Sequence, residues 1–124
     1  MRVVICLVAG IALCATSQAA VAKPAFQLMK TSWTFTDTDG TKVQESVDSN
    51  GNYILQSAEG KHLDHGTSMM KGEKACFTSA MTKEGENCWT TKPTEVGQSL
   101  ETVNGKGKKL TVTRVEYAPL SMPK

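Results

Sequence analysis

Turn-forming residues recur about every ten positions along most of the chain, a spacing typical of all-β domains. Asp37-Thr38-Asp39-Gly40, Ser49-Asn50-Gly51 and Glu59-Gly60 separate short segments in which apolar and polar residues alternate. No window keeps a helical period. We therefore predict an all-β fold: a small antiparallel meander of about seven to eight strands, either a barrel or a two-sheet sandwich, with one disulfide. The predicted strands cover residues 32–36, 43–47, 52–57, 61–65, 67–71, 75–80, 88–91, 96–103 and 110–117.

Two of these segments depart from simple alternation. Gly66 divides the fourth from the fifth, which predicts a turn there. In the last segment Leu110 and Val112 share one face, but Val115 has the opposite parity. A β-bulge near Thr113-Arg114 would restore the phase, because a bulge inserts one extra residue into one strand.

The first 22 residues have the three-part layout of a secretory signal peptide. Arg2 precedes an apolar run of residues 3–15, and small residues follow up to Ala22. Cleavage is expected after Ala22 or, alternatively, after Ala19. The run is too short for a stable bilayer-spanning helix. We therefore predict a signal peptide at 1–22 and a single exported β domain at 23–124, periplasmic or secreted, without a transmembrane segment once the signal is removed.

The exported part has few residues from which to build a core. Only 32 of the 102 residues after position 22 are apolar. Such a chain folds when its net charge is low, and here the charge is close to balanced. Balanced charge also disfavours a polyanion, so no nucleic-acid partner is expected. The predicted core residues are Trp33, Phe35, Val47, Tyr53, Phe77, Trp89, Leu100, Val112 and Val115.

Two cysteines remain after signal removal, Cys76 and Cys88. Two cysteines in an exported chain predict a disulfide, and a chain with a small core is expected to need such a covalent cross-link. Each is followed by an aromatic residue and a threonine. In paired strands the two sulfurs would leave one face of the hairpin and the two rings the other.

Four short patterns occur in order along the chain: Gly51-x-Tyr53, Asp64-His65-Gly66-Thr67, Lys74-x-Cys76-Phe77-Thr78 and Cys88-Trp89-Thr90. This order resembles small exported proteins of alphaproteobacteria, in which a G-x-Y strand, a D-x-G-T turn and a C-F…C-[WY] pair recur. The resemblance spans residues 33–117. It implies the periplasm and the disulfide, and it implies no activity.

A metal site is the one ligand cluster that the sequence offers. Imidazole, carboxylate and thioether groups suit copper, and the first two suit zinc. In an extended strand His62 and Asp64 share a face and His65 points away, whereas a turn before Gly66 could bring both histidines together. The candidate ligands are His62, Asp64, His65, Met69 and Met70.

Other chemistry has little support. The fragments around Gly40 and Gly51 lack the first and twelfth ligands of an EF-hand, so both are interpreted as turns. The lysines of 106–109 form a basic turn without interleaved aromatics, which favours a solvated hairpin tip. No G-x-S-x-G or H-E-x-x-H motif is present, so no catalytic residues are predicted.

Three hypotheses follow. The first is a non-enzymatic exported domain that binds a ligand or serves as an envelope accessory, with no cofactor and with an envelope component or protein as a possible partner. The second is a periplasmic copper- or zinc-binding protein. The third is an envelope hydrolase or an inhibitor of one, which two carboxylates facing each other across a cleft would favour.

Overall fold

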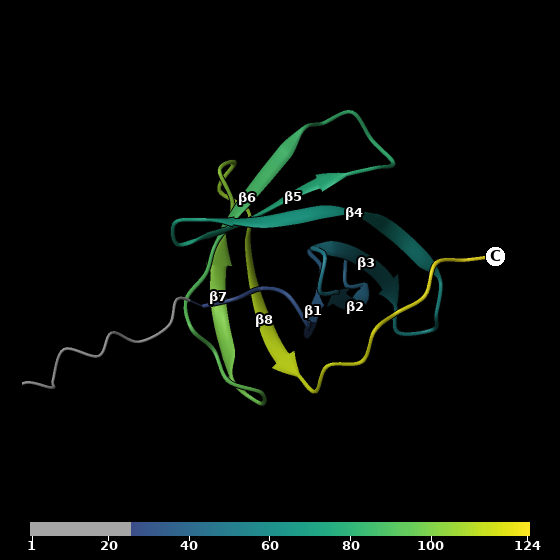
Figure 1. Ribbon diagram of the computed structural model, residues 1–124, viewed down its shortest axis with the longest axis horizontal. Helices are drawn as coiled ribbons and strands as arrows, with labels where there is room; N and C mark the ends of the chain where they lie inside the picture. The colour runs from purple at the N-terminus through teal and green to yellow at the C-terminus, as the bar shows by residue number, and fades with distance from the viewer. Residues whose placement is uncertain (1–25) are drawn as a thin grey trace, which may run out of the picture.

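Eight antiparallel strands, joined in chain order, wind into one sheet (Figure 1). The computed structural model describes residues 26–124, so the predicted signal segment at 1–22 lies outside the described residues. The strands are β1 (Thr31–Thr36), β2 (Lys42–Val47), β3 (Asn52–Ser57), β4 (His62–Lys71), β5 (Lys74–Ser79), β6 (Glu86–Thr90), β7 (Ser99–Val103) and β8 (Lys109–Val115).

The sheet closes on itself almost completely. Its order is β6-β5-β4-β3-β2-β1-β8-β7, so the pairing of β8 with β1 joins the two ends of the chain. The edge strands β6 and β7 meet through one bridge, Trp89 with Asn104, and through the Thr102 Oγ1 donating to the Thr90 carbonyl at 2.5 Å. The prediction of an all-β meander is confirmed, and of the two architectures left open the chain forms the barrel.

Gly66 lies inside β4, so the predicted turn at this position is wrong. A Cβ here would collide with the backbone carbonyl oxygen of Thr78 on β5. The glycine is therefore needed for close approach of two strands rather than for a change of direction. Strand β4 runs without a break through ten residues.

The bulge also lies elsewhere than predicted. Strand β8 pairs with β1 in unbroken register, which places Arg114 opposite Trp33 inside the barrel and Val115 opposite Ser32 outside it. Val115 is half-buried on the outer face and is not a core residue. The register shifts instead in β4, where Asp64 pairs with Leu55 and His62 with Gln56, leaving Leu63 as the extra residue.

One end of the barrel is packed. Leu28, Val47, Tyr53 and Ala75 form a buried cluster there, and Phe26 and Met70 pack against it. The segment before β1 is fixed by Lys30 N, which donates to the Val47 carbonyl at 2.8 Å, and by Thr31 Oγ1, which donates to Leu28 O. The N-terminal segment therefore closes this end. Trp33, Tyr53, Val47 and Leu100 are buried as predicted, whereas Phe35, Phe77, Trp89 and Val112 are half-buried.

The C-terminal tail crosses the outer face of β1 and β2. Ala118 N donates to Ser32 Oγ at 2.9 Å, and Leu120 N donates to Ser46 Oγ at 3.0 Å. Both serines are buried, although they point away from the barrel interior. The tail thus supplies partners that two buried hydroxyl groups require.

The predicted disulfide is confirmed. Cys76 and Cys88 are direct cross-strand partners in β5 and β6 and are bonded to each other. Phe77 and Trp89 line the barrel interior, so the rings and the sulfurs leave opposite faces as expected.

Candidate ligand cavity

The barrel interior contains a cavity of about 230 Å³ between the packed end and the opposite mouth. Side chains from all eight strands reach it, and the loops at the mouth add Thr82, Glu84 and Gly85. An apolar cavity of about 150 Å³ already holds one benzene molecule. The space therefore suits a molecule with one ring or a body of similar size.

Aromatic side chains make most of the cavity wall. Five of the chain's seven aromatic residues line it, including both tryptophans. Tyr53 and Phe77 meet edge to face, with ring centroids 5.2 Å apart. Such walls are typical of small-molecule sites, in which a few polar groups fix the orientation of the ligand. The five aromatic residues are Trp33, Phe35, Tyr53, Phe77 and Trp89.

Glu45 is the polar group that stands out inside the cavity. It lies on β2 in step with Val43 and Val47, whose side chains are buried inside the barrel. Glu45 is half-buried, and its side chain lines the cavity. No hydrogen bond or ion pair reaches its carboxyl group from any residue of 26–124. Burial raises the pKa of Glu45 to about 8.

A second carboxyl group, that of Asp64, is fully engaged by its neighbours. The Tyr53 hydroxyl donates to one Asp64 oxygen at 2.8 Å, and the Ser79 hydroxyl donates to the other at 2.6 Å. Burial, followed by the bond to Asp64, raises the pKa of Tyr53 above its usual range. The phenol therefore stays protonated and keeps donating. This network joins β3, β4 and β5 on the cavity wall.

The mouth of the cavity carries charges of both signs. Lys108 Nζ lies 2.8 Å from Asp37 Oδ1, and this hydrogen bond lowers the pKa of Asp37. Glu84 is exposed on the loop between β5 and β6. Lys108 belongs to the turn predicted to be a solvated tip, but its ammonium pairs with Asp37, which follows the neighbouring strand β1. Counting Glu45 and Asp64, four carboxyl groups and one amine line the cavity and its mouth.

The two predicted metal-ligand histidines do come together. The Nε2 of His62 lies 3.0 Å from the Nδ1 of His65. The bulge at Leu63 causes this, because it gives both side chains the same outward face of β4. The prediction that His62 would share a face with Asp64 is wrong for the same reason.

The other predicted metal ligands lie elsewhere. Asp64 points into the barrel, and Met70 packs against the core at the packed end. Met69 lies on the outer face, four residues along the strand from His65, or about 13 Å. The structure therefore brings two of the five predicted ligands into contact, and metal binding stays a prediction.

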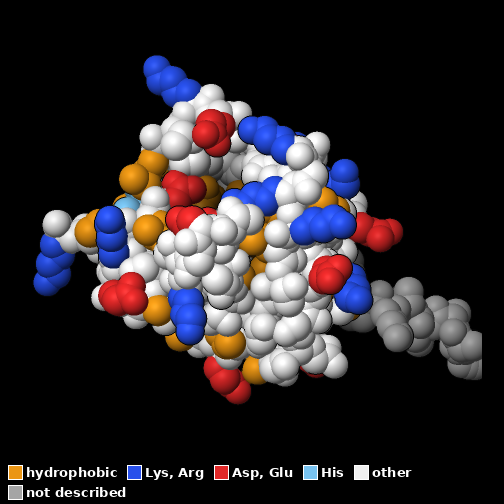
Figure 2. All heavy atoms as spheres, turned by 180° about the vertical axis from the view of Figure 1, so that it is seen from behind, with side chains coloured by type: hydrophobic (Ala, Val, Ile, Leu, Met, Phe, Trp, Pro, Cys, Tyr) orange, Lys and Arg blue, Asp and Glu red, His pale blue; other side chains and the backbone are white. Residues whose placement is uncertain are grey.

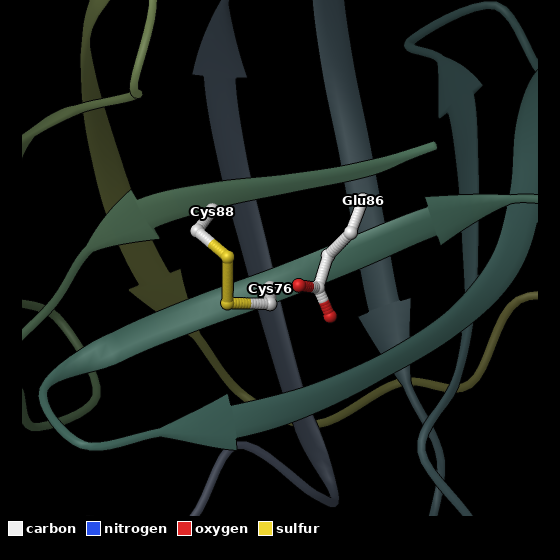
Figure 3. Close-up of side chains that lie close together, drawn as sticks. All are labelled: Cys76, Glu86 and Cys88. Carbon is white, nitrogen blue, oxygen red and sulfur yellow. A yellow bond between two sulfur atoms is a disulfide. The ribbon is translucent and has the colours of Figure 1, made fainter. Parts of the chain in front are cut away.

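Cys76, Glu86 and Cys88 also lie close together, as Figure 3 shows. The disulfide engages both sulfurs, so neither offers the thiolate that binds a metal. The Lys71 Nζ lies 2.8 Å from the Glu86 Oε1, and the two side chains form an ion pair on the outer face of β4–β6. This group is structural in the oxidised protein.

Comparisons with protein-family models, curated proteins and solved structures find no match for the chain. The resemblance to exported alphaproteobacterial proteins stays a prediction.

Two surface properties bear on possible partners. Within residues 26–124 there is no helix with the length and apolar character needed to cross a membrane. The face in Figure 2 carries basic and acidic side chains intermixed, rather than a field of one sign. The expectation of no nucleic-acid partner stays a prediction.

Sequence reasoning missed Glu45, although a signal was present. In the segment 43–47 an acid stands between two valines of the same parity. A carboxyl group at an inward position is costly unless it has a partner. A charged residue in an otherwise apolar face of a predicted strand is the signal that could have identified Glu45.

Proposed function

We propose that this protein is a non-enzymatic exported binding protein that holds a small molecule inside its barrel. The ligand would have an apolar body of about one ring. The observation that supports this most is the unpartnered Glu45 carboxyl group inside an aromatic-walled cavity.

The cavity and its carboxyl group both work against stability. Atoms lining an empty space lose the dispersion contacts that a packed interior provides. A half-buried carboxyl group without protein partners loses part of its hydration. A chain with only 32 apolar residues among 102 has little stability to spare. A bound ligand would supply the missing contacts, and this favours a binding role.

An enzyme remains the second candidate because two carboxyl groups share the cavity. Glu45 has a raised pKa, as a general acid requires, and Asp64 is held by hydrogen bonds. However, both Asp64 oxygens already accept hydrogen bonds, and the cavity suits one ring rather than a polymer. A reproducible turnover that is lost in Glu45→Gln would replace the binding proposal.

The binding proposal is tested with a neutral ring of suitable size. Trp33 and Trp89, the chain's only tryptophans, both line the cavity and report on its occupancy through fluorescence. Benzyl alcohol should give a saturable one-site change, whereas a four-ring steroid should give none. Leu110→Phe narrows the cavity and should weaken binding. Met69→Phe adds a ring on the outer face and serves as the matched control. No saturable change with benzyl alcohol would refute the proposal.

Export is tested by the mass of the protein recovered from the periplasm or medium. Cleavage after Ala22 leaves a chain that begins at Lys23, and cleavage after Ala19 one that begins at Ala20. Retention of the uncut chain in the cytoplasm would contradict export.

A further inference from the structure

We propose that the cavity selects small organic cations, namely protonated amines with an apolar body, and that Glu45 is their counter-ion. This inference rests on the proposed function, because it names the ligand class of the same cavity.

The charges around the cavity favour a cation over an anion. The titratable groups that line it with Glu45 are those of Asp37, Tyr53, Asp64, Glu84 and Lys108. The Arg114 guanidinium also lies inside the barrel, opposite Trp33, where it donates a hydrogen bond to the Thr94 carbonyl at 2.8 Å. The one amine is already paired with Asp37. An anionic ligand would meet uncompensated carboxyl groups and would itself have to leave water. The chain as a whole carries a formal charge of +2, so this acidic lining is a local feature of the cavity.

Glu45 is the carboxyl group with both oxygens free to meet a ligand inside the barrel. The oxygens of Asp64 accept from Tyr53 and Ser79, and Glu84 is exposed on its loop. An ammonium group has three donors, which matches the unmet acceptors of a lone carboxylate.

The neighbours of Glu45 suit the rest of such a ligand. Trp33 is its direct cross-strand partner on β1, and Leu55 is its partner on β3. Direct cross-strand partners have Cβ atoms about 5 Å apart. An ammonium bound to Glu45 would therefore lie beside the indole of Trp33, whose face attracts cations. The remaining aromatic wall would cover the apolar body.

The exchange involves one proton. In the free protein at neutral pH, burial keeps Glu45 mostly protonated. When an ammonium ion enters, the carboxyl O–H bond breaks, the oxygen keeps the electron pair, and the proton passes to the buffer. The ammonium and the carboxylate remain as an ion pair. Binding should therefore release close to one proton per ligand from pH 5 to 7, where the free carboxyl group is mostly protonated.

The test compares two probes of nearly equal shape, benzylammonium and benzyl alcohol, by calorimetry. Benzylammonium stays protonated from pH 5 to 8. Its affinity should rise about tenfold per pH unit from pH 5 to 7, because one proton leaves. Titrations in buffers of different ionisation enthalpy measure the number of protons released, because the observed binding enthalpy changes with the buffer in proportion to that number. The affinity for benzyl alcohol should not rise with pH.

Two variants locate the effect. Glu45→Gln should lower benzylammonium affinity at pH 8 by at least about tenfold and leave benzyl alcohol binding within about threefold. Glu101→Gln removes the same formal charge from an exposed position on the outer face of β7, where salt screens it, and should change affinity by no more than about twofold.

The outcomes are distinguishable. If benzyl alcohol binds as well as benzylammonium at pH 8, or if Glu45→Gln leaves the preference intact, the cation inference is overturned while the binding proposal survives. If neither probe binds, the binding proposal fails first. Preference for benzylammonium with proton release, lost in Glu45→Gln, supports both.

Discussion

The two ends of the barrel interior differ in how completely they are packed, although the same strands build both. On β2, Val47 is fully buried in the cluster at the packed end, and Glu45 lies two residues away on the same face. Val47 is surrounded by Leu28, Tyr53 and Ala75. Glu45 instead faces a cavity of about 230 Å³ without a partner.

The packed end supplies stability, and the open end is where we propose that a ligand binds. Tight packing at one end provides the contacts that hold a small barrel together. The other end leaves contacts unmade and a carboxyl group unsatisfied, and these are the features through which a ligand would gain affinity.

Leu28→Ala should destabilise the protein by about 3 to 5 kcal/mol, because Leu28 is buried in the packed cluster, although it also borders the cavity. Leu110→Ala should cost about 1 to 2 kcal/mol, since Leu110 lines the cavity, is only half-buried and lies outside the packed cluster. Urea unfolding at a fixed pH measures both. Equal costs would show that the two ends are packed alike.

Removing the disulfide with Cys76→Ser and Cys88→Ser together should cost about 3 kcal/mol, because the bond closes a short loop in the unfolded chain. The melting temperature should then fall by more than about ten degrees in a domain of this size. An unchanged melting temperature in calorimetry would mean that the bridge contributes nothing to stability.

Glu45 should make the protein less stable as the pH rises. Its folded pKa is about 8 and its ordinary value is 4.5, so the folded state holds more protons between these limits. The free energy of unfolding should therefore fall from pH 4.5 to 8 and level off above. The shift sets an upper bound of about 5 kcal/mol, and water in the cavity reduces it, so we expect on the order of 2 kcal/mol.

Glu45→Gln tests this assignment directly. The variant should be more stable than the parent at pH 8 and should lose the slope between pH 4.5 and 8. Glu84→Gln should keep the slope. Urea unfolding across this range would count against the account if Glu45→Gln kept the slope of the parent.

The smallest effect is expected at the mouth. Lys108 and Asp37 are both more than a third exposed, so Lys108→Ala should cost less than about 1 kcal/mol. The ion pair needs Asp37 in its ionised form, whose pKa the Lys108 hydrogen bond lowers. Its contribution to the free energy of unfolding should therefore be lost as the pH falls below about 4. Removing the amine should also raise benzylammonium affinity by about twofold. A weaker affinity would mean that Lys108 shapes the site.

Local signals in the sequence predicted most of the strands, the turns at Gly40 and Gly51, and the disulfide. Turn chemistry at Gly40 and Gly51 acts within a few residues, and the pairing of Cys76 with Cys88 needs only one hairpin. These features are confirmed because each depends on neighbours along the chain.

Features that depend on distant strands were not predictable in the same way. Gly66 is required by the approach of the Thr78 backbone, and the bulge at Leu63 by the register with β3. The cavity arises only when β8 pairs with β1. Glu45 carried a local signal in its parity with Val43 and Val47, but its meaning depends on which face closure turns inward.

The most direct test of the account is the titration of the Glu45 carboxyl carbon by NMR in the purified, oxidised protein. Without ligand the midpoint should lie near pH 8, and saturating benzylammonium should lower it by at least about three units, as a tenfold rise in affinity per pH unit from pH 5 to 7 requires. Benzyl alcohol should not lower it. A midpoint near 4.5 in the free protein would mean that the carboxyl group is hydrated and that the cavity is not the site described above.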